Sequence, residues 1–241
     1  MSLGNQAERK RLFNQNLKSK REKGDEIWVA RILMELSDAN RKLGLFEEGI
    51  RQAREALEIY QRLGITTDQG ECLNNLAWLF YEDKLLEAAK EAAFRSFGLL
   101  PEKGHEYQVC RSRRLLGHIY RSEGKREKAI SHFEEAIAIV SLFNWHDQLF
   151  WSHYSLAEIS VDRCGIESAH THIEQAKSHA VNDAYNLTRT VRLQALVWYQ
   201  QCRFKHAESE ALHASEIYEK LGAAEDLEAC RKLLQDIKRA M

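Results

Sequence analysis

Proline is almost absent from this sequence, since Pro101 is the single proline in 241 residues. Because proline interrupts helix interiors, a chain with so little of it can be helical nearly throughout. The β-branched and aromatic runs that strands favour are also missing, and Ala, Leu, Glu, Lys, Arg and Gln dominate. The composition of 44% hydrophobic and 29% charged residues is that of a globular protein. The sequence therefore predicts an all-α protein.

Other absences narrow the class of protein. No stretch approaches the roughly 18 consecutive apolar residues of a membrane span, so we expect no contact with a membrane. The 35 Lys and Arg residues balance the 36 Asp and Glu residues, for a net charge of −1, which argues against general affinity for nucleic acid. The five cysteines are widely spaced and form no C-x-x-C pair. This pattern indicates free thiols in a reducing, intracellular compartment such as the cytoplasm, with neither disulfides nor a zinc site.

Catalytic motifs are missing as well. The sequence has no G-x-x-x-x-G-K-[ST] phosphate loop, no G-x-S-x-G elbow and no H-E-x-x-H pair, so we expect no enzyme, no cofactor and no small-molecule substrate. The ten histidines include His170 and His172, which are two residues apart, and His206 and His213, which are seven apart. Residues two apart do not share a helix face, and residues seven apart lie two turns distant. The sequence therefore predicts scattered surface histidines rather than a metal site.

An internal repeat organises the chain. A small residue recurs at Ser37, Ala77, Gly117, Ala157 and Ala195, with spacings of 40, 40, 40 and 38 residues. Further small residues follow each of these after twelve and nineteen positions. Each repeat predicts two amphipathic helices whose backbones approach closely at the small residues. The small residues predicted to lie in the core are Ala77, Gly117, Ala129, Ala136, Ala157, Ala169, Ala176, Ala195, Ala207 and Ala214. Because one pair cannot bury its apolar faces alone, neighbouring pairs are expected to stack.

The predicted turns between the two helices of a repeat contain glycine. They include Leu43-Gly44-Leu45, Ser122-Glu123-Gly124 and Arg163-Cys164-Gly165. Glycine adopts the left-handed backbone conformation that often ends a helix. Cys164 and Cys202 occupy the same turn position in neighbouring repeats, but their helices are too far apart for us to expect a disulfide.

These residues resemble the tetratricopeptide repeat, whose pattern runs W-x₂-L-G-x₂-Y, then A-x₃-F, then P. The best match has Leu116, Gly117, Tyr120, Ala129, Phe133 and Ala136, and Pro101 stands at the closing position of the preceding repeat. The stretch from Leu73 to Ala77 is similar to the kinesin-light-chain subtype. The C-terminal half resembles the repeat tails of fungal NB-ARC (STAND) signalling ATPases in FNWHDQLFW from Phe143, AKSHAVNDAYNL from Ala176 and YEKLGAAEDLEACRKLLQ from Tyr218. The resemblance implies a right-handed α-solenoid of about five helix pairs with an extra helix at each end.

The same repeat frame divides the chain into three segments. Residues 1–25 are expected to form an N-terminal helix that corresponds to the second helix of a truncated repeat. Residues 26–221 are expected to form five repeats. Residues 222–241 are expected to form a C-terminal capping helix, because Leu233 and Leu234 stand where a small residue would be needed. We expect the chain to be a fragment of a larger signalling protein.

The N-terminal segment is basic, and two interpretations of it are open. It carries Arg9, Lys10, Arg11, Lys18, Lys20, Arg21 and Lys23, interrupted by Leu12, Phe13 and Leu17. A basic amphipathic helix of this kind can bind an acidic membrane, nucleic acid or calmodulin. Alternatively, it is a solvated helix whose small apolar face covers the first repeat. The sequence favours the second interpretation, because the repeat frame already accounts for the apolar residues.

The resemblance also selects a candidate binding surface, since the first helix of each pair lines a concave groove in this family. That face comprises Asn75, Trp78, Tyr81, Arg111, Arg114, His118, Arg121, Trp151, Tyr154, Glu158, Arg189, Arg192 and Tyr199. Asn75 is expected to hydrogen-bond a peptide backbone. The arginines suit carboxylates, and the tryptophans and tyrosines supply rigid apolar anchors.

We therefore expect a non-catalytic scaffold that binds a protein or an extended or helical peptide with acidic and apolar residues. A chaperone C-terminus does not fit, because Met34 and Asp38 stand where the family's carboxylate clamp needs Lys and Asn. Two further functions are open: a sensor or oligomerisation tail that acts through intramolecular contacts, and a nucleic-acid-binding solenoid, which the near-neutral charge disfavours. The groove residues are alternatively a solvated, salt-bridged surface, with binding through loops such as residues 144–148.

Overall fold

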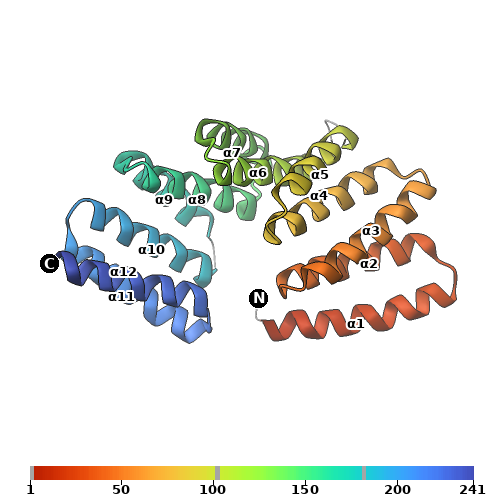
Figure 1. Cartoon of the computed structure of the whole chain (residues 1–241), viewed down its shortest axis with the longest axis horizontal. Coiled ribbons are helices and arrows are strands. Elements are labelled where there is room, and N and C mark those ends of the chain that lie inside the picture. The colour runs from red at the N-terminus through yellow and green to blue at the C-terminus, as the bar shows by residue number, and fades with distance from the viewer. Residues whose placement is uncertain (1–2, 101–103, 181–182) are drawn as a thin grey trace. The chain divides into compact units, whose positions relative to one another are not determined.

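The structure, a computed structural model, describes residues 3–100, 104–180 and 183–241. In these three ranges every regular element is an α-helix and no strand is present, which confirms the predicted all-α class (Figure 1). The helices are α1 (Leu3–Glu22), α2 (Glu26–Lys42), α3 (Phe46–Arg62), α4 (Thr66–Glu82), α5 (Leu86–Leu99), α6 (Glu106–Ser122), α7 (Arg126–Val140), α8 (His146–Asp162), α9 (Ile166–His179), α10 (Ala184–Gln200), α11 (Phe204–Leu221) and α12 (Ala224–Ala240). Pro101 lies outside the described residues. None of these helices has the length and apolarity that a membrane crossing requires.

The chain divides into two compact units, residues 1–125 and 126–241. The first unit holds α1 to α6, and the second holds α7 to α12. The division falls inside the predicted third repeat, between its first and second helices.

In the first unit, consecutive helices pack as hairpins. Helix α2 packs on α3, α4 packs on α5, and α1 covers α2. The first helices of successive pairs also make contact, α2 with α4 and α4 with α6. The core beneath α1 contains Leu33, Leu36 and Tyr60. This arrangement places one face of α4 and α6 together, as the repeat interpretation requires.

Small residues lie where the helices approach most closely. The ten predicted core positions, Ala77, Gly117, Ala129, Ala136, Ala157, Ala169, Ala176, Ala195, Ala207 and Ala214, are all buried, which confirms that prediction. At the first pair, a Cβ added at Gly49 would stand 2.8 Å from the Leu79 Cδ2 atom and 3.2 Å from the Ser37 carbonyl oxygen. The Ser37 hydroxyl donates to the Gly49 carbonyl oxygen over 2.8 Å. A methyl group at position 49 would therefore push these helices apart.

The turns recur every 20 residues from position 24 to position 164. Residues with left-handed backbone stand at positions 24, 44, 64, 84, 104, 124, 144 and 164, and again at 202 and 222. At most of these turns the residue after the left-handed one donates its backbone N–H to a carbonyl five positions back, as Leu45 does to Asn40 over 2.9 Å. This bond satisfies a carbonyl at the helix end. Of the three turns in which a left-handed glycine was predicted, Gly44 and Gly124 have a positive φ. At the third turn the prediction is wrong, because Cys164 has the left-handed φ of 54° while Gly165 has a φ of −83°.

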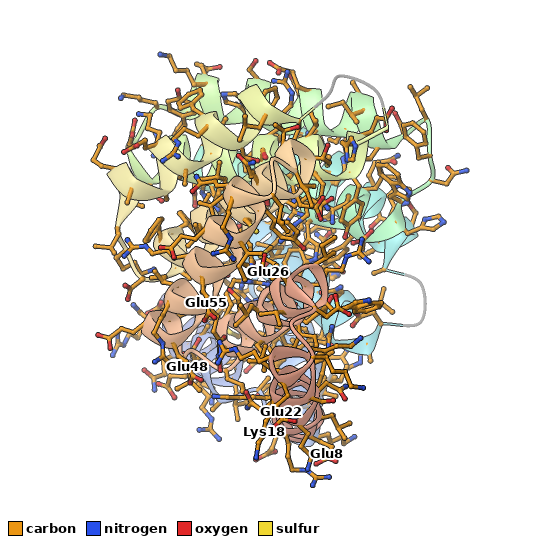
Figure 2. All side chains as sticks on the ribbon, turned by 90° about the vertical axis from the view of Figure 1, so that its right-hand side faces the viewer. Glu8, Lys18, Glu22, Glu26, Glu48 and Glu55 are labelled. Atoms are coloured by element: carbon orange, nitrogen blue, oxygen red, sulfur yellow. The ribbon has the colours of Figure 1, made fainter. Side chains whose placement is uncertain are left out.

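Helix α1 is tied to the first pair by both charge and apolar packing. The Lys10 ammonium contacts the Glu48 carboxylate on α3 over 2.9 Å, and Arg21 contacts Glu55 over 2.5 Å. Glu48 and Glu55 are labelled on α3 in Figure 2. Phe13 and Leu17 pack against the core of α2 and α3. These contacts support the interpretation of α1 as a helix that covers the first repeat.

In the second unit, α8 packs on α9, α10 packs on α11, and α12 closes the end of α11. Leu233 and Ile237 of α12 are buried against Ala207 and Ala211 of α11, and Leu234 packs at the edge of this cluster. The first helices α8 and α10 also contact each other, which brings their facing side chains together.

Candidate functional site

The candidate site in the first unit is a cation–aromatic cluster on α4 and α6, which we call the Trp78 cluster (Trp78, Tyr81, Arg114 and His118). The Trp78 and His118 ring centroids lie 5.8 Å apart, and those of Tyr81 and His118 lie 5.9 Å apart. The Arg114 guanidinium lies over the Trp78 ring at 5.6 Å. The Trp78 indole N–H is buried and has no acceptor among the described residues. Four of the predicted groove residues are therefore in mutual contact.

The Trp78 cluster is surrounded by positive charge. Burial, reinforced by the neighbouring Arg114 and Arg121 guanidiniums, lowers the pKa of His118 to about 3, so the imidazole is neutral at pH 7. Arg111 stands on the same face of α6, and burial together with the nearby charge of Arg41 lowers its pKa. Residues 111, 114, 118 and 121 share one helix face because they are three or four positions apart.

Asn75 does not lie free in the groove, contrary to the prediction. Its side chain is only 4% exposed, and its Nδ2 atom donates to the Ser37 hydroxyl over 3.0 Å. The Oδ1 atom is buried without a partner. The amide therefore links α4 to α2 inside the protein. The sequence had suggested that it would hydrogen-bond a peptide backbone, but in this position it cannot.

The candidate site in the second unit centres on Arg189 of α10. The Arg189 guanidinium lies over three aromatic rings, at 5.1 Å from Trp151, 5.6 Å from Tyr154 and 5.0 Å from Tyr185. Asp226 of α12 lies 3.9 Å from it. We call this group the Arg189 cluster (Trp151, Tyr154, Tyr185, Arg189 and Asp226). A cation over aromatic faces is stabilised by the ring quadrupoles.

Arg192 extends the same surface by one turn of α10. Its Nη2 atom donates to the Tyr154 hydroxyl over 3.2 Å. Burial opposes the charge of Arg192, but Tyr154, Tyr218 and Asp226 outweigh it and raise the pKa of this guanidinium. Burial, with a contribution from Glu158, raises the pKa of Tyr154 to about 12, so its hydroxyl stays protonated. The predicted residues Trp151, Tyr154, Glu158, Arg189 and Arg192 thus share one electrostatic environment.

One predicted groove residue of the second unit lies elsewhere. Tyr199 packs against Phe204, with ring centroids 5.9 Å apart, at the edge of the apolar cluster of Ala195, Ala207 and Ile237. Position 199 belongs to the last turn of α10, next to the start of α11 at Phe204, and its ring packs there.

Three residues of the second site were not predicted: Tyr185, Tyr218 and Asp226. Tyr185 stands four positions before Arg189, so its place on the same helix face was available as a signal. Its hydroxyl donates to Asp226 over 2.5 Å. Tyr218 and Asp226 belong to α11 and α12, and the sequence assigned α12 to capping alone.

Surface hollows and loops give little further support for a ligand site. A shallow hollow of about 360 Å³ lies on α3, lined by Glu47, Ile50, Arg51, Arg54, Glu55 and Glu58, none of which belongs to either cluster. In the loop before α8, Phe143 and Trp145 stack with ring centroids 4.6 Å apart. Where the structure describes the chain, no group of three or more metal-ligating side chains is arranged to hold a metal ion.

Comparisons with known proteins identify the repeat. Residues 115–139 match the family model of the tetratricopeptide repeat. The fold is similar to that of BtubC from P. vanneervenii, with a TM-score of 0.73, 17% identity, and coverage of 90% of this chain and 92% of that one. It is also similar to a Rap protein complexed with competence and sporulation factor, with a TM-score of 0.70, 18% identity, and coverage of 98% and 71%.

A third similar structure is a signal transduction ATPase of the STAND class with a tetratricopeptide repeat sensor, from Pyrococcus horikoshii. Its TM-score is 0.69 at 19% identity, and the match covers 95% of this chain but 38% of that one. A comparison with curated proteins finds no match. The family-model match confirms a predicted tetratricopeptide repeat at residues 115–139, and the similar structures share the helical fold.

Proposed function

We propose that this chain of tetratricopeptide repeats is a protein-interaction scaffold that binds a peptide segment with acidic and apolar residues. The observation that carries the proposal is the Arg189 cluster, where a guanidinium is held against three aromatic rings. Arginine, tryptophan and tyrosine are the residue types that dominate the energy of protein interfaces.

The arginines of the second unit keep hydrogen-bond donors for a ligand. A guanidinium has five N–H donors. Arg192 gives one hydrogen bond to the Tyr154 hydroxyl, and Arg189 stands 3.9 Å from the Asp226 carboxylate, beyond hydrogen-bond distance. The Arg189 side chain is 23% exposed. An incoming carboxylate can therefore take a bidentate position on Arg189 while its apolar neighbour packs on Trp151.

The first unit supports the same kind of ligand. Its Trp78 cluster also places an arginine over a tryptophan, with neutral His118 beside them. Because His118 is uncharged at pH 7, the attraction for acidic residues comes from Arg114 and Arg121. Each unit thus carries one cation–aromatic cluster on its first helices.

The proposal is tested with a library of 12-residue peptides in which acidic, basic and aromatic positions are varied. Binding is measured by fluorescence anisotropy at low and high salt. We expect selection of peptides that combine Asp or Glu with Trp, Phe or Leu, and weaker binding at high salt because the charges are screened. Arg189→Gln should weaken the selected peptide about tenfold, or about 1.4 kcal/mol.

Arg231→Gln is the matched control, because Arg231 is an exposed arginine on α12. It should bind with wild-type affinity. Equal affinities for wild type and Arg189→Gln, with helicity unchanged by circular dichroism, would remove the Arg189 cluster from the binding site. Selection of basic peptides would contradict the proposed ligand.

A sensor or oligomerisation role is the second candidate. It is favoured by the similarity to part of a STAND ATPase and by the resemblance of the C-terminal half to repeat tails of that class. In that case the chain would bind another module of the same protein or a second copy of itself. Light scattering after size-exclusion chromatography distinguishes binding of a second copy from peptide capture, since only self-association raises the measured mass with concentration.

The finer domain organisation is part of this proposal. We propose that residues 26–221 comprise five repeats of the right-handed type, flanked by an N-terminal helix within residues 1–25 and a capping helix within 222–241. The bounds of α1, α11 and α12 are compatible with these limits.

A further inference from the structure

Four histidines of the second unit form two facing pairs between α8 and α9. The Nδ1 atoms of His146 and His179 lie 3.2 Å apart, and so do the Nδ1 atoms of His153 and His172. The rings of His153 and His179 are stacked with centroids 6.0 Å apart, which connects the two pairs. The positions rise by seven along α8 and fall by seven along α9, so the pairs are successive rungs of an antiparallel helix hairpin.

We propose that these pairs bind divalent transition-metal ions, Cu²⁺ or Zn²⁺, with one ion between the two imidazoles of each pair. The bond from zinc to a histidine nitrogen is about 2.0–2.1 Å, so two such nitrogens at the tetrahedral angle stand about 3.3–3.4 Å apart. The Nδ1 separation of 3.2 Å fits this geometry in both pairs. Imidazole ligands favour copper and zinc over magnesium and calcium.

The surroundings of the pairs suit an open site. His153, His172 and His179 are partly buried, and His146 is exposed, so water can reach the remaining coordination positions. Burial, with the neighbouring His172 and His179, lowers the pKa of His153 to about 4. Neutral imidazoles are the form that binds metal. Each site offers two protein ligands, and water or a partner completes the coordination.

The prediction of no metal site was based on pairs along the sequence, and those pairs remain outside the proposal. His170 and His206 contact the Trp198 ring, at 5.4 and 5.6 Å between centroids. The facing pairs are different, because each joins one histidine of α8 to one of α9. A bound ion would therefore link the two helices and stabilise their hairpin.

The experiment uses the full chain, without a polyhistidine tag and freed of metal, titrated with Zn²⁺ and with Cu²⁺ by calorimetry. We expect binding of up to two ions and a rise in the thermal midpoint. The double variant His153→Gln/His172→Gln should lose one ion, and His146→Gln/His179→Gln should lose the other. The control His206→Gln/His213→Gln also removes two histidines, both of them exposed, and should bind like wild type.

A second measurement does not depend on the loss of binding. In His172→Cys the new thiolate should join His153 on Co²⁺ and give a sulfur-to-metal charge-transfer band, which wild type lacks. Absence of this band, absence of binding by wild type, or equal weakening in the His206/His213 control would overturn the proposal. The imidazole pairs would then be N–H···N hydrogen bonds only.

Discussion

Gly49 on α3 lies so close to Leu79 on α4 that a Cβ at position 49 would stand 2.8 Å from the leucine Cδ2 atom. The contact joins the second helix of one pair to the first helix of the next. A substitution that adds one methyl group at position 49 therefore tests how closely neighbouring helix pairs are packed.

Gly49→Ala should destabilise the protein by about 1–3 kcal/mol, since overpacking forces neighbours to move. The Ser37 carbonyl oxygen, 3.2 Å from the same Cβ, is backbone and has little freedom to yield. Gly98→Ala is the control, because a Cβ at this exposed position on α5 meets nothing within 4 Å. It should stabilise by about 0.5–1 kcal/mol. Urea unfolding measures both, and equal midpoints would contradict the predicted close approach.

Acid should destabilise the first unit through His118. Its pKa is about 3 in the folded protein and about 6.5 in an unfolded chain. Below pH 6.5 the unfolded state therefore binds more protons, and the free energy of unfolding falls with falling pH, by at most about 1.4 kcal/mol per pH unit. This loss continues until the pH nears the folded-state pKa. His118→Gln should show a shallower slope between pH 6.5 and 4.5 in urea unfolding. An unchanged slope would show that His118 is protonated in the native protein.

The turn at Lys84 should gain stability from glycine. Lys84 has a φ of 65°, and a left-handed conformation costs a residue with a Cβ about 1–2 kcal/mol. Lys84→Gly should therefore stabilise the protein by about 0.5–1 kcal/mol after the greater flexibility of the unfolded chain is subtracted. The neighbouring Asp83 has a φ of −79°, so Asp83→Gly should destabilise instead. Thermal midpoints with the same sign for both variants would count against this backbone argument.

Thiol labelling should separate the five cysteines into two groups. Cys164 and Cys202 are exposed, while Cys72, Cys110 and Cys230 are buried. Burial, together with the charge of Asp68, raises the pKa of Cys72 and makes it still less reactive. Ellman's reagent should therefore titrate two thiols quickly and the other three only after denaturant is added. Peptide mass spectrometry identifies the labelled residues, and early labelling of Cys110 or Cys230 would contradict the packing described.

The sequence predicted the helical class and the buried small residues because both follow from spacing along the chain. Ala77 and Ala157, for instance, recur with the repeat and are fully buried. Such a pattern indicates how the two helices of a repeat pack, because in every repeat their backbones approach closely at the same positions.

The candidate site was predicted less completely, because it depends on contacts between residues of different helices. Asn75 was placed on the correct helix, but its hydrogen bond to Ser37 depends on how α2 and α4 are aligned. Asp226 joins Arg189 from a helix that spacing identified only as a cap. The histidine pairs likewise appear only when α8 and α9 lie antiparallel. Contacts of this kind depend on register between elements, which a periodic pattern along one chain does not encode.

Left-handed residues recur every twenty positions from 24 to 164, so each stretch of twenty residues contains one helix and its turn. Along the chain, the first and second helices of the repeat alternate. Loss of forty residues, such as 85–124, would join Lys84 directly to Lys125 and leave a first helix followed by a second helix. Loss of twenty would instead place two helices of the same type in succession and bring the small-residue faces out of phase. Removing or inserting a whole repeat inside the array thus keeps the alternation of the two helix types, while removing or inserting half a repeat breaks it.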